Sequence, residues 1–232
     1  ELNLILKEYG FKIDATRKVP VILPIDHPEQ KEPLYQLLIT GDDISRKSDL
    51  ILRLFTVGQQ SGKVEINSIG QQLFYGALVP EDKLSETFPD LATATAKKAY
   101  IHTRFSTNSF PTPGNIMPFG HIYLNGENLA ATAMARWLEN SLHKENSHLN
   151  LGGMSDTRVE DILIKYLKTK GYSLEESTEL LFAKKGSALQ KLIDVFAPLR
   201  HQGPAAYVIY DPSENKVFSS TQGERPSEMT ES

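Results

Sequence analysis

Residues 102–127 bring together side chains that can bind a small polar molecule. Their sequence is HTRFSTNSFPTPGNIMPFGHIYLNGE, which holds an arginine, several hydroxyls and two bends bounded by prolines. Arg104 lies near Thr107 among other small polar residues, and a guanidinium in such surroundings can hold a carboxylate through two parallel hydrogen bonds. The alternative is a surface arginine in a strand, and residue type alone favours it.

Two further positions carry potential chemistry. Asn125 and Gly126 lie in the polar turn that ends a predicted strand, and an amide next to a glycine N–H can form an oxyanion hole. The alternative is a plain turn, because Asn-Gly is a strong turn signal, and residue type alone favours the turn. Asp156 lies at a predicted helix start, where its carboxylate can bind a substrate ammonium or simply complement the helix dipole.

Composition excludes several classes of protein. The chain has 232 residues, a net charge of −4 and no cysteine, which excludes disulfides, thiolate metal sites and a cysteine nucleophile within these residues. Basic residues are not clustered, and no apolar run approaches the roughly 18–20 residues of a membrane span. We therefore expect no nucleic-acid or membrane partner. The six histidines are scattered, so no metal site is expected, and without an export signal the expected location is the cytoplasm.

The residue patterns predict groups of strands separated by groups of helices. Helices are predicted at 1–10, 43–62, 80–88, 128–143, 159–171, 174–186 and 187–199. Strands are predicted at 11–22, 33–40, 97–105, 119–127, 203–211 and 216–221, with two more in 63–79. Thr157 with Glu160, and Ser173 with Glu176, have the spacing of helix capping boxes. Such grouping indicates a layered α+β domain rather than alternating βαβ units.

Several segments resemble one family in the same order. HTRFSTNSFP, PFGHIYLNGE and GGMSDTRVEDIL are similar to the class II glutamine amidotransferase domain of glutamate synthase. YGALVPEDKLSETFPDL, upstream, and GPAAYVIYDPSENKVFSSTQGERP, near the end, extend the resemblance from Phe74 to Pro226, and it continues more weakly towards the N-terminus. It implies that residues 1–232 form one α+β domain, a four-layer αββα N-terminal-nucleophile hydrolase sandwich that is incomplete at its N-terminus.

The resemblance also implies a reaction. In that family an N-terminal cysteine thiolate attacks the glutamine side-chain amide, with its own α-amine as the general base. The ammonia travels to a synthase domain or subunit, where 2-oxoglutarate becomes glutamate with electrons from reduced FMN and an iron–sulfur cluster. Carried over residue by residue, Arg104 holds the glutamine α-carboxylate and Thr107 lines the pocket. Asn125 and the Gly126 N–H form the oxyanion hole, and Asp156 binds the α-ammonium.

This chain departs from the family pattern in several places. The nucleophile is absent, and since the chain starts at Glu1 and has a polar end we expect a piece of a longer protein, poorly soluble on its own. Leu124 stands where the family has histidine, Asn128 stands where it has isoleucine, and Met117 replaces a glutamine. Two alternatives therefore stay open: a non-catalytic module that binds an amino acid or a partner subunit, and an amidase with a serine or threonine nucleophile.

The carboxylate role of Arg104 gives a first prediction. Arg104→Ala is expected to remove glutamine binding measured by calorimetry, because the guanidinium is the group that pairs with the α-carboxylate. Binding that survives this substitution would exclude the role, whether the chain is catalytic or not.

Overall fold

The computed structural model of the chain describes residues 2–19, 34–41, 47–61, 75–97, 99–103, 115, 119, 122–144, 149–182, 200–211 and 216–223. The helices are α1 (Leu2–Glu8), α2 (Lys47–Ser61), α3 (Leu84–Thr87), α4 (Ala131–His143), α5 (Asp156–Thr169) and α6 (Leu174–Phe182), with short 3-10 segments η2 (Glu81–Lys83) and η3 (Pro89–Thr93). The strands are β1 (Phe11–Val19), β2 (Leu34–Gly41), β3 (Ile122–Gly126), β4 (Ala205–Asp211) and β5 (Lys216–Gln222).

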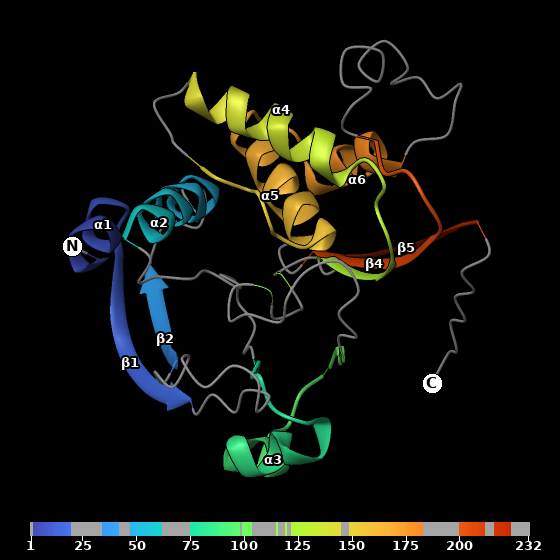
Figure 1. Ribbon diagram of the computed structural model, residues 1–232. Coiled ribbons are helices and arrows are strands. Elements are labelled where there is room, and N and C mark those ends of the chain that lie inside the picture. Colours follow the sequence, from blue (N-terminus) through green and yellow to red (C-terminus); the bar gives the residue numbers. More distant parts are fainter. Residues whose placement is uncertain are drawn as a thin grey trace.

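The described strands form two antiparallel sheets. One is the pair β1–β2, and the other has the order β3-β4-β5. Figure 1 shows α4, α5 and α6 gathered beside the second sheet, with α1 and α2 next to β1. The predicted hairpin at the end of the chain is confirmed as β4–β5. The mixed α+β character predicted from the sequence is likewise confirmed.

The main core lies between α5 and the sheet β3-β4-β5. Strand β3 alternates, with Ile122 and Leu124 buried and Asn125 exposed, as expected when one face of a sheet is covered. On β4, alternate residues of the same face are buried as well: Ala205, Tyr207 and Ile209. Helix α5 is buried along most of its length, from Thr157 to Leu167, because it packs against α2, α4, α6 and β3.

Helix α2 joins this core to a smaller one. Its residues Ile51 and Phe55 belong to the main cluster, while Leu50 and Leu54 pack with Leu6 of α1 and other apolar side chains of α1 and β1. A helix with apolar residues on two sides is expected to be covered on both. Through α2, the N-terminal elements are thereby linked to α5, the helix that begins at Asp156.

Most predicted elements in the described range are confirmed, and one capping prediction is wrong. Ser173 and Glu176 exchange the two hydrogen bonds of a capping box. The box predicted for Thr157 does not form, because Ser155 caps α5 by accepting from the Arg158 N–H, and Glu160 turns into the core instead.

Some predicted elements are not found or not described. Residues 75–79 and 99–103 are not in strands, although strands were predicted there. Tyr100 packs its ring against Tyr123 of β3 at 4.9 Å between centroids, so a side chain rather than a ladder attaches this segment to the sheet. The predicted helix at 187–199 and the rest of the predicted strands in 63–79 lie outside the described residues.

A buried group of charges fixes α5 against α2. Asp161 and Lys165 form an ion pair one helical turn apart, with side chains 0% and 2% exposed. The Arg158 guanidinium lies 4.5 Å from the centre of the Phe55 ring of α2, and the Lys165 ammonium lies 5.6 Å from the same centre. Burial raises the pKa of Asp161 and lowers the pKa of Lys165, and each partner offsets part of the other's shift.

Breaking this ion pair is expected to destabilise the chain strongly. Asp161→Asn leaves the Lys165 ammonium in the core without its carboxylate and should lower the free energy of unfolding by about 3–5 kcal/mol. Urea unfolding measures the loss. The double variant Asp161→Leu/Lys165→Met should recover part of it, since neither charge of the pair stays buried, while the buried Arg158 guanidinium remains. An Asp161→Asn protein as stable as the wild type would contradict this account.

Candidate functional site

The two predicted oxyanion residues lie at the end of β3, an edge strand of its sheet in the part of the chain that the structure describes. Asn125 is opposite Ala206 of β4 and Gly126 is opposite Ala205. The Glu127 N–H donates to the Pro204 carbonyl at 3.3 Å. Because hydrogen-bonded and non-bonded pairs alternate along an antiparallel ladder, Gly126 belongs to a non-bonded pair. Its N–H therefore points away from β4, towards the outer edge of β3.

Asn125 is exposed on the face of β3 that does not pack against α5. Tyr123 lies on the same face, with Tyr100 and Tyr210 close by in an aromatic cluster. Burial, with smaller contributions from the two neighbouring tyrosines, raises the pKa of Tyr123 to about 12. The phenol is therefore neutral at physiological pH and keeps an O–H that can donate, in addition to the Asn125 amide and the Gly126 N–H at this strand end.

Asp156 is brought to the same place from a distant part of the sequence. Its Oδ2 accepts the Asn128 backbone N–H at 2.8 Å, and its Oδ1 accepts the Thr157 N–H at 2.7 Å. The structure thus joins the first residue of α5 to the chain just beyond Gly126. The Thr157 hydroxyl also donates to Oδ1, at 3.3 Å. A carboxylate has about four acceptor positions, so beside these three donors one remains for an ammonium.

Arg104 and Thr107, the other predicted substrate-binding residues, lie outside the described residues. Their roles stay predictions. Of the predicted site residues, the structure describes Asn125 and Gly126 at the end of β3, and Asp156 hydrogen-bonded to the N–H of Asn128, two residues beyond Gly126.

Sequence reasoning missed a buried polar network directly under this site. The Asn128 Nδ2 donates to Glu160 Oε1 at 2.7 Å, and the same oxygen lies 2.6 Å from Nδ1 of His201. Desolvation raises the pKa of Glu160, and the hydrogen bonds from His201 and Asn128 offset part of that rise. The signal was present, because Glu160 follows Asp156 by one helical turn and so faces the same way.

Two glycines allow the strand end to approach the segment before β4. A Cβ on Gly126 would overlap the Pro204 carbonyl oxygen and the Ala205 Cα, and a Cβ on Gly203 would overlap the Glu127 carbonyl. Gly203 also has a φ of +127°, which favours glycine. The position of the Gly126 N–H thus depends on a close backbone crossing.

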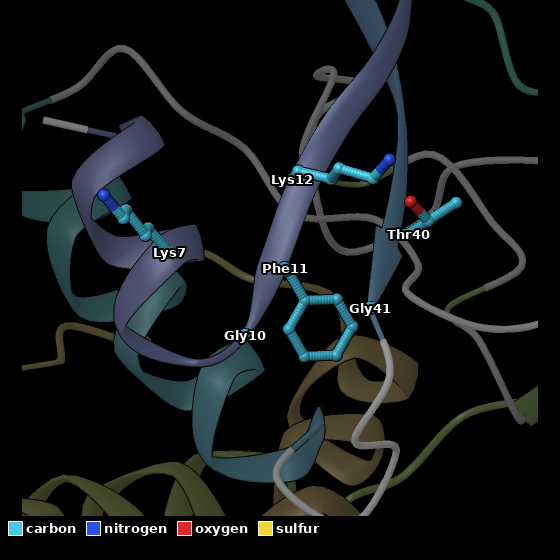
Figure 2. Close-up of a pocket in the computed structure, with 6 residues that line it drawn as sticks. All are labelled: Lys7, Gly10, Phe11, Lys12, Thr40 and Gly41. Atoms are coloured by element: carbon cyan, nitrogen blue, oxygen red, sulfur yellow. The ribbon is translucent and has the colours of Figure 1, made fainter.

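A cavity among the described residues lies away from this site. It has a volume of about 180 Å³ and lies where β1 and β2 meet α1, lined by Lys7, Gly10, Phe11, Lys12, Thr40 and Gly41. Figure 2 shows the Phe11 ring lying against Gly41, which closes one side of it. The Lys12 ammonium forms an ion pair with the Asp14 carboxylate, with 3.2 Å between Nζ and Oδ1. None of the predicted site residues lines this cavity.

Neither a metal cluster nor a membrane span is found in the described part of the chain. No three His, Asp or Glu side chains there are grouped to hold a metal ion. Of the helices described, none has the length and apolar character needed to cross a bilayer.

The chain belongs to the class II glutamine amidotransferases. The model of this family matches residues 1–202, which include Asn125, Gly126 and Asp156. The family transfers the amide of glutamine, so glutamine is the amide donor that membership indicates. Comparison with curated proteins gives no match. Sequence patterns therefore identified the class, while the glutamate synthase context stays a prediction.

Replacing Gly126 tests the backbone crossing. Gly126→Ala should lower the free energy of unfolding by about 1–3 kcal/mol, because the added methyl overlaps backbone atoms of β4 that cannot rotate away. Thermal or urea unfolding measures the change. Gly152→Ala is the matched control, since its Cβ meets only the Asn150 side chain at 3.1 Å, and it should stay within about 0.5 kcal/mol of wild type. Equal losses in both variants would contradict the crossing.

Proposed function

We propose that this chain is the glutamine-binding part of a glutaminase domain, which releases ammonia for a glutamate synthase-like synthase domain or subunit. The observation that carries the proposal is the geometry at the end of β3. The Gly126 N–H points off the sheet edge, Asn125 is exposed, and Asp156 is joined to the residue that follows this turn. This geometry supports the proposal, because a bound glutamine requires donors for an oxyanion and a carboxylate for its ammonium.

The proposed reaction assigns each group one task. Arg104 pairs with the α-carboxylate of glutamine, Thr107 lines the pocket and Asp156 binds the α-ammonium. A cysteine thiolate outside these 232 residues attacks the side-chain carbonyl carbon, and the carbonyl oxygen becomes an oxyanion held by Asn125 and Gly126. The C–N bond then breaks, a proton from the nucleophile's α-ammonium leaves with ammonia, and water hydrolyses the thioester to glutamate.

The wider context is part of the same proposal and rests on the resemblance of the segments between Phe74 and Pro226. It includes the four-layer αββα arrangement, the cytoplasmic location, and an associated synthase domain with FMN and an iron–sulfur cluster. This chain has no cysteine, and such clusters are held mainly by cysteine thiolates, so the cluster is assigned to the synthase domain.

A second candidate function is a non-catalytic module that binds an amino acid or a partner subunit. The departures at Leu124 and Asn128 motivated it. Leu124 is 3% exposed and belongs to the core on the α5 side of β3, opposite to the face of Asn125. Its replacement of a histidine therefore removes no polar group from the Asn125 face. Asn128 is also buried, so neither departure takes away an oxyanion donor.

An activity measurement separates the two functions. In the full protein that carries this chain, Asn125→Ala should lower kcat for glutamine hydrolysis by about 10²–10³-fold with a small change in KM, because the amide acts on the oxyanion. Asn140→Ala, an exposed asparagine on α4, is the matched control and should leave kcat unchanged. A wild-type protein that binds glutamine without hydrolysing it would support the non-catalytic module. An Asn125→Ala enzyme with wild-type kcat would exclude the oxyanion role.

A further inference from the structure

Asn128 connects four parts of the chain beside the Asn125–Gly126 turn. Its Oδ1 accepts the backbone N–H of Ala130, at the start of α4, at 2.9 Å, and the N–H of Gln202, before β4, at 3.1 Å. Its Nδ2 donates to Glu160 of α5, and its own N–H donates to Asp156. One residue, through its side chain and its backbone N–H, therefore links the end of β3 to the start of α4, to α5 and to the segment before β4.

Glu160 binds the Asn128 side chain in the core, and His201 binds Glu160. Both of their side chains are 0% exposed, and Glu160 Oε1 is shared between Asn128 Nδ2 and His201 Nδ1. His201 is itself fixed, because its backbone N–H donates to the Leu181 carbonyl at 2.8 Å. The ring of His201 also packs against Phe182 of α6. The network thus extends from α6 to the turn of the proposed site.

Burying the polar side chains of Glu160 and His201 carries a free-energy cost of desolvation. Glu160 Oε2 and His201 Nε2 are buried without a hydrogen-bond partner among the described residues. A buried polar pair of this kind is often replaced by apolar residues with no loss of stability. Apolar residues cannot accept a hydrogen bond from the Asn128 amide, which links the chain just beyond the turn to α5.

We propose that Glu160 and His201 are positioning residues that act through Asn128 to hold the Asn125–Gly126 turn in register with Asp156. The proposal rests on the proposed function, because it concerns the placement of the oxyanion donors. Neither residue touches the substrate. Their loss should therefore affect the transition state, where donor placement matters most, more than the binding of glutamine.

The test replaces the pair without leaving a buried charge. In the full protein, Glu160→Leu/His201→Phe should keep a cooperative thermal transition but lower kcat for glutamine by about 10–100-fold, with KM within about twofold of wild type. Asp161→Leu/Lys165→Met is the matched control, because it replaces the neighbouring buried pair on the same helix and has no hydrogen bond to Asn128. Its kcat should equal that of the wild type.

Two further variants keep the test decisive. Glu160→Gln retains the oxygen that accepts from Asn128 and should keep most of the kcat, which a general loss of stability would not explain. If the double variant does not fold, Asn128→Ser serves instead: it keeps the backbone N–H to Asp156, cannot reach Glu160, and should show the same selective fall in kcat.

The outcomes distinguish this inference from the proposed function. A wild-type protein without glutaminase activity would overturn both. If the wild type is active and Asn125→Ala is slow, the proposed function holds. A folded Glu160→Leu/His201→Phe protein with wild-type kcat would then overturn the positioning role alone, as would a folded Asn128→Ser protein with wild-type kcat.

Discussion

The contact between the end of β3 and the start of α5 is the interaction on which the proposed site depends. Asp156 accepts the Asn128 N–H there, and Asn128 in turn reaches Glu160 one helical turn further along. These bonds join segments that are far apart in the sequence. Because they are buried or half-buried, competition from water is weak and the relative position of strand and helix is well defined.

Helix α5 contributes to two buried polar pairs that have different roles, one within the helix and one with His201. Asp161 and Lys165 lie near Phe55 and fix the helix against α2, whereas Glu160 and His201 lie under the end of β3. Adjacent positions on a helix point about 100° apart, so one helix can serve a structural contact on one side and the proposed site on another. The arrangement makes α5 the common support of the fold and of the site.

The local elements were largely predictable, because they depend on short-range patterns. The capping box of Ser173 and Glu176 and the β4–β5 hairpin follow from residue types at fixed spacing. The capping box predicted at Thr157 does not form for a local reason, because the Ser155 hydroxyl accepts the Arg158 N–H and caps the helix instead. The strand predicted around Tyr100 is not formed at residues 99–103, where the Tyr100 ring packs against Tyr123 of β3.

The sequence by itself determined the class of the protein and the identity of its polar groups. Motif order identified a class II glutamine amidotransferase, and composition showed that these residues contain no cysteine nucleophile. The tertiary structure decided the direction of the Gly126 N–H and the burial of Glu160 and His201. Ladder register and long-range hydrogen bonds set both, and these depend on which distant segments meet, which no local pattern of residues encodes.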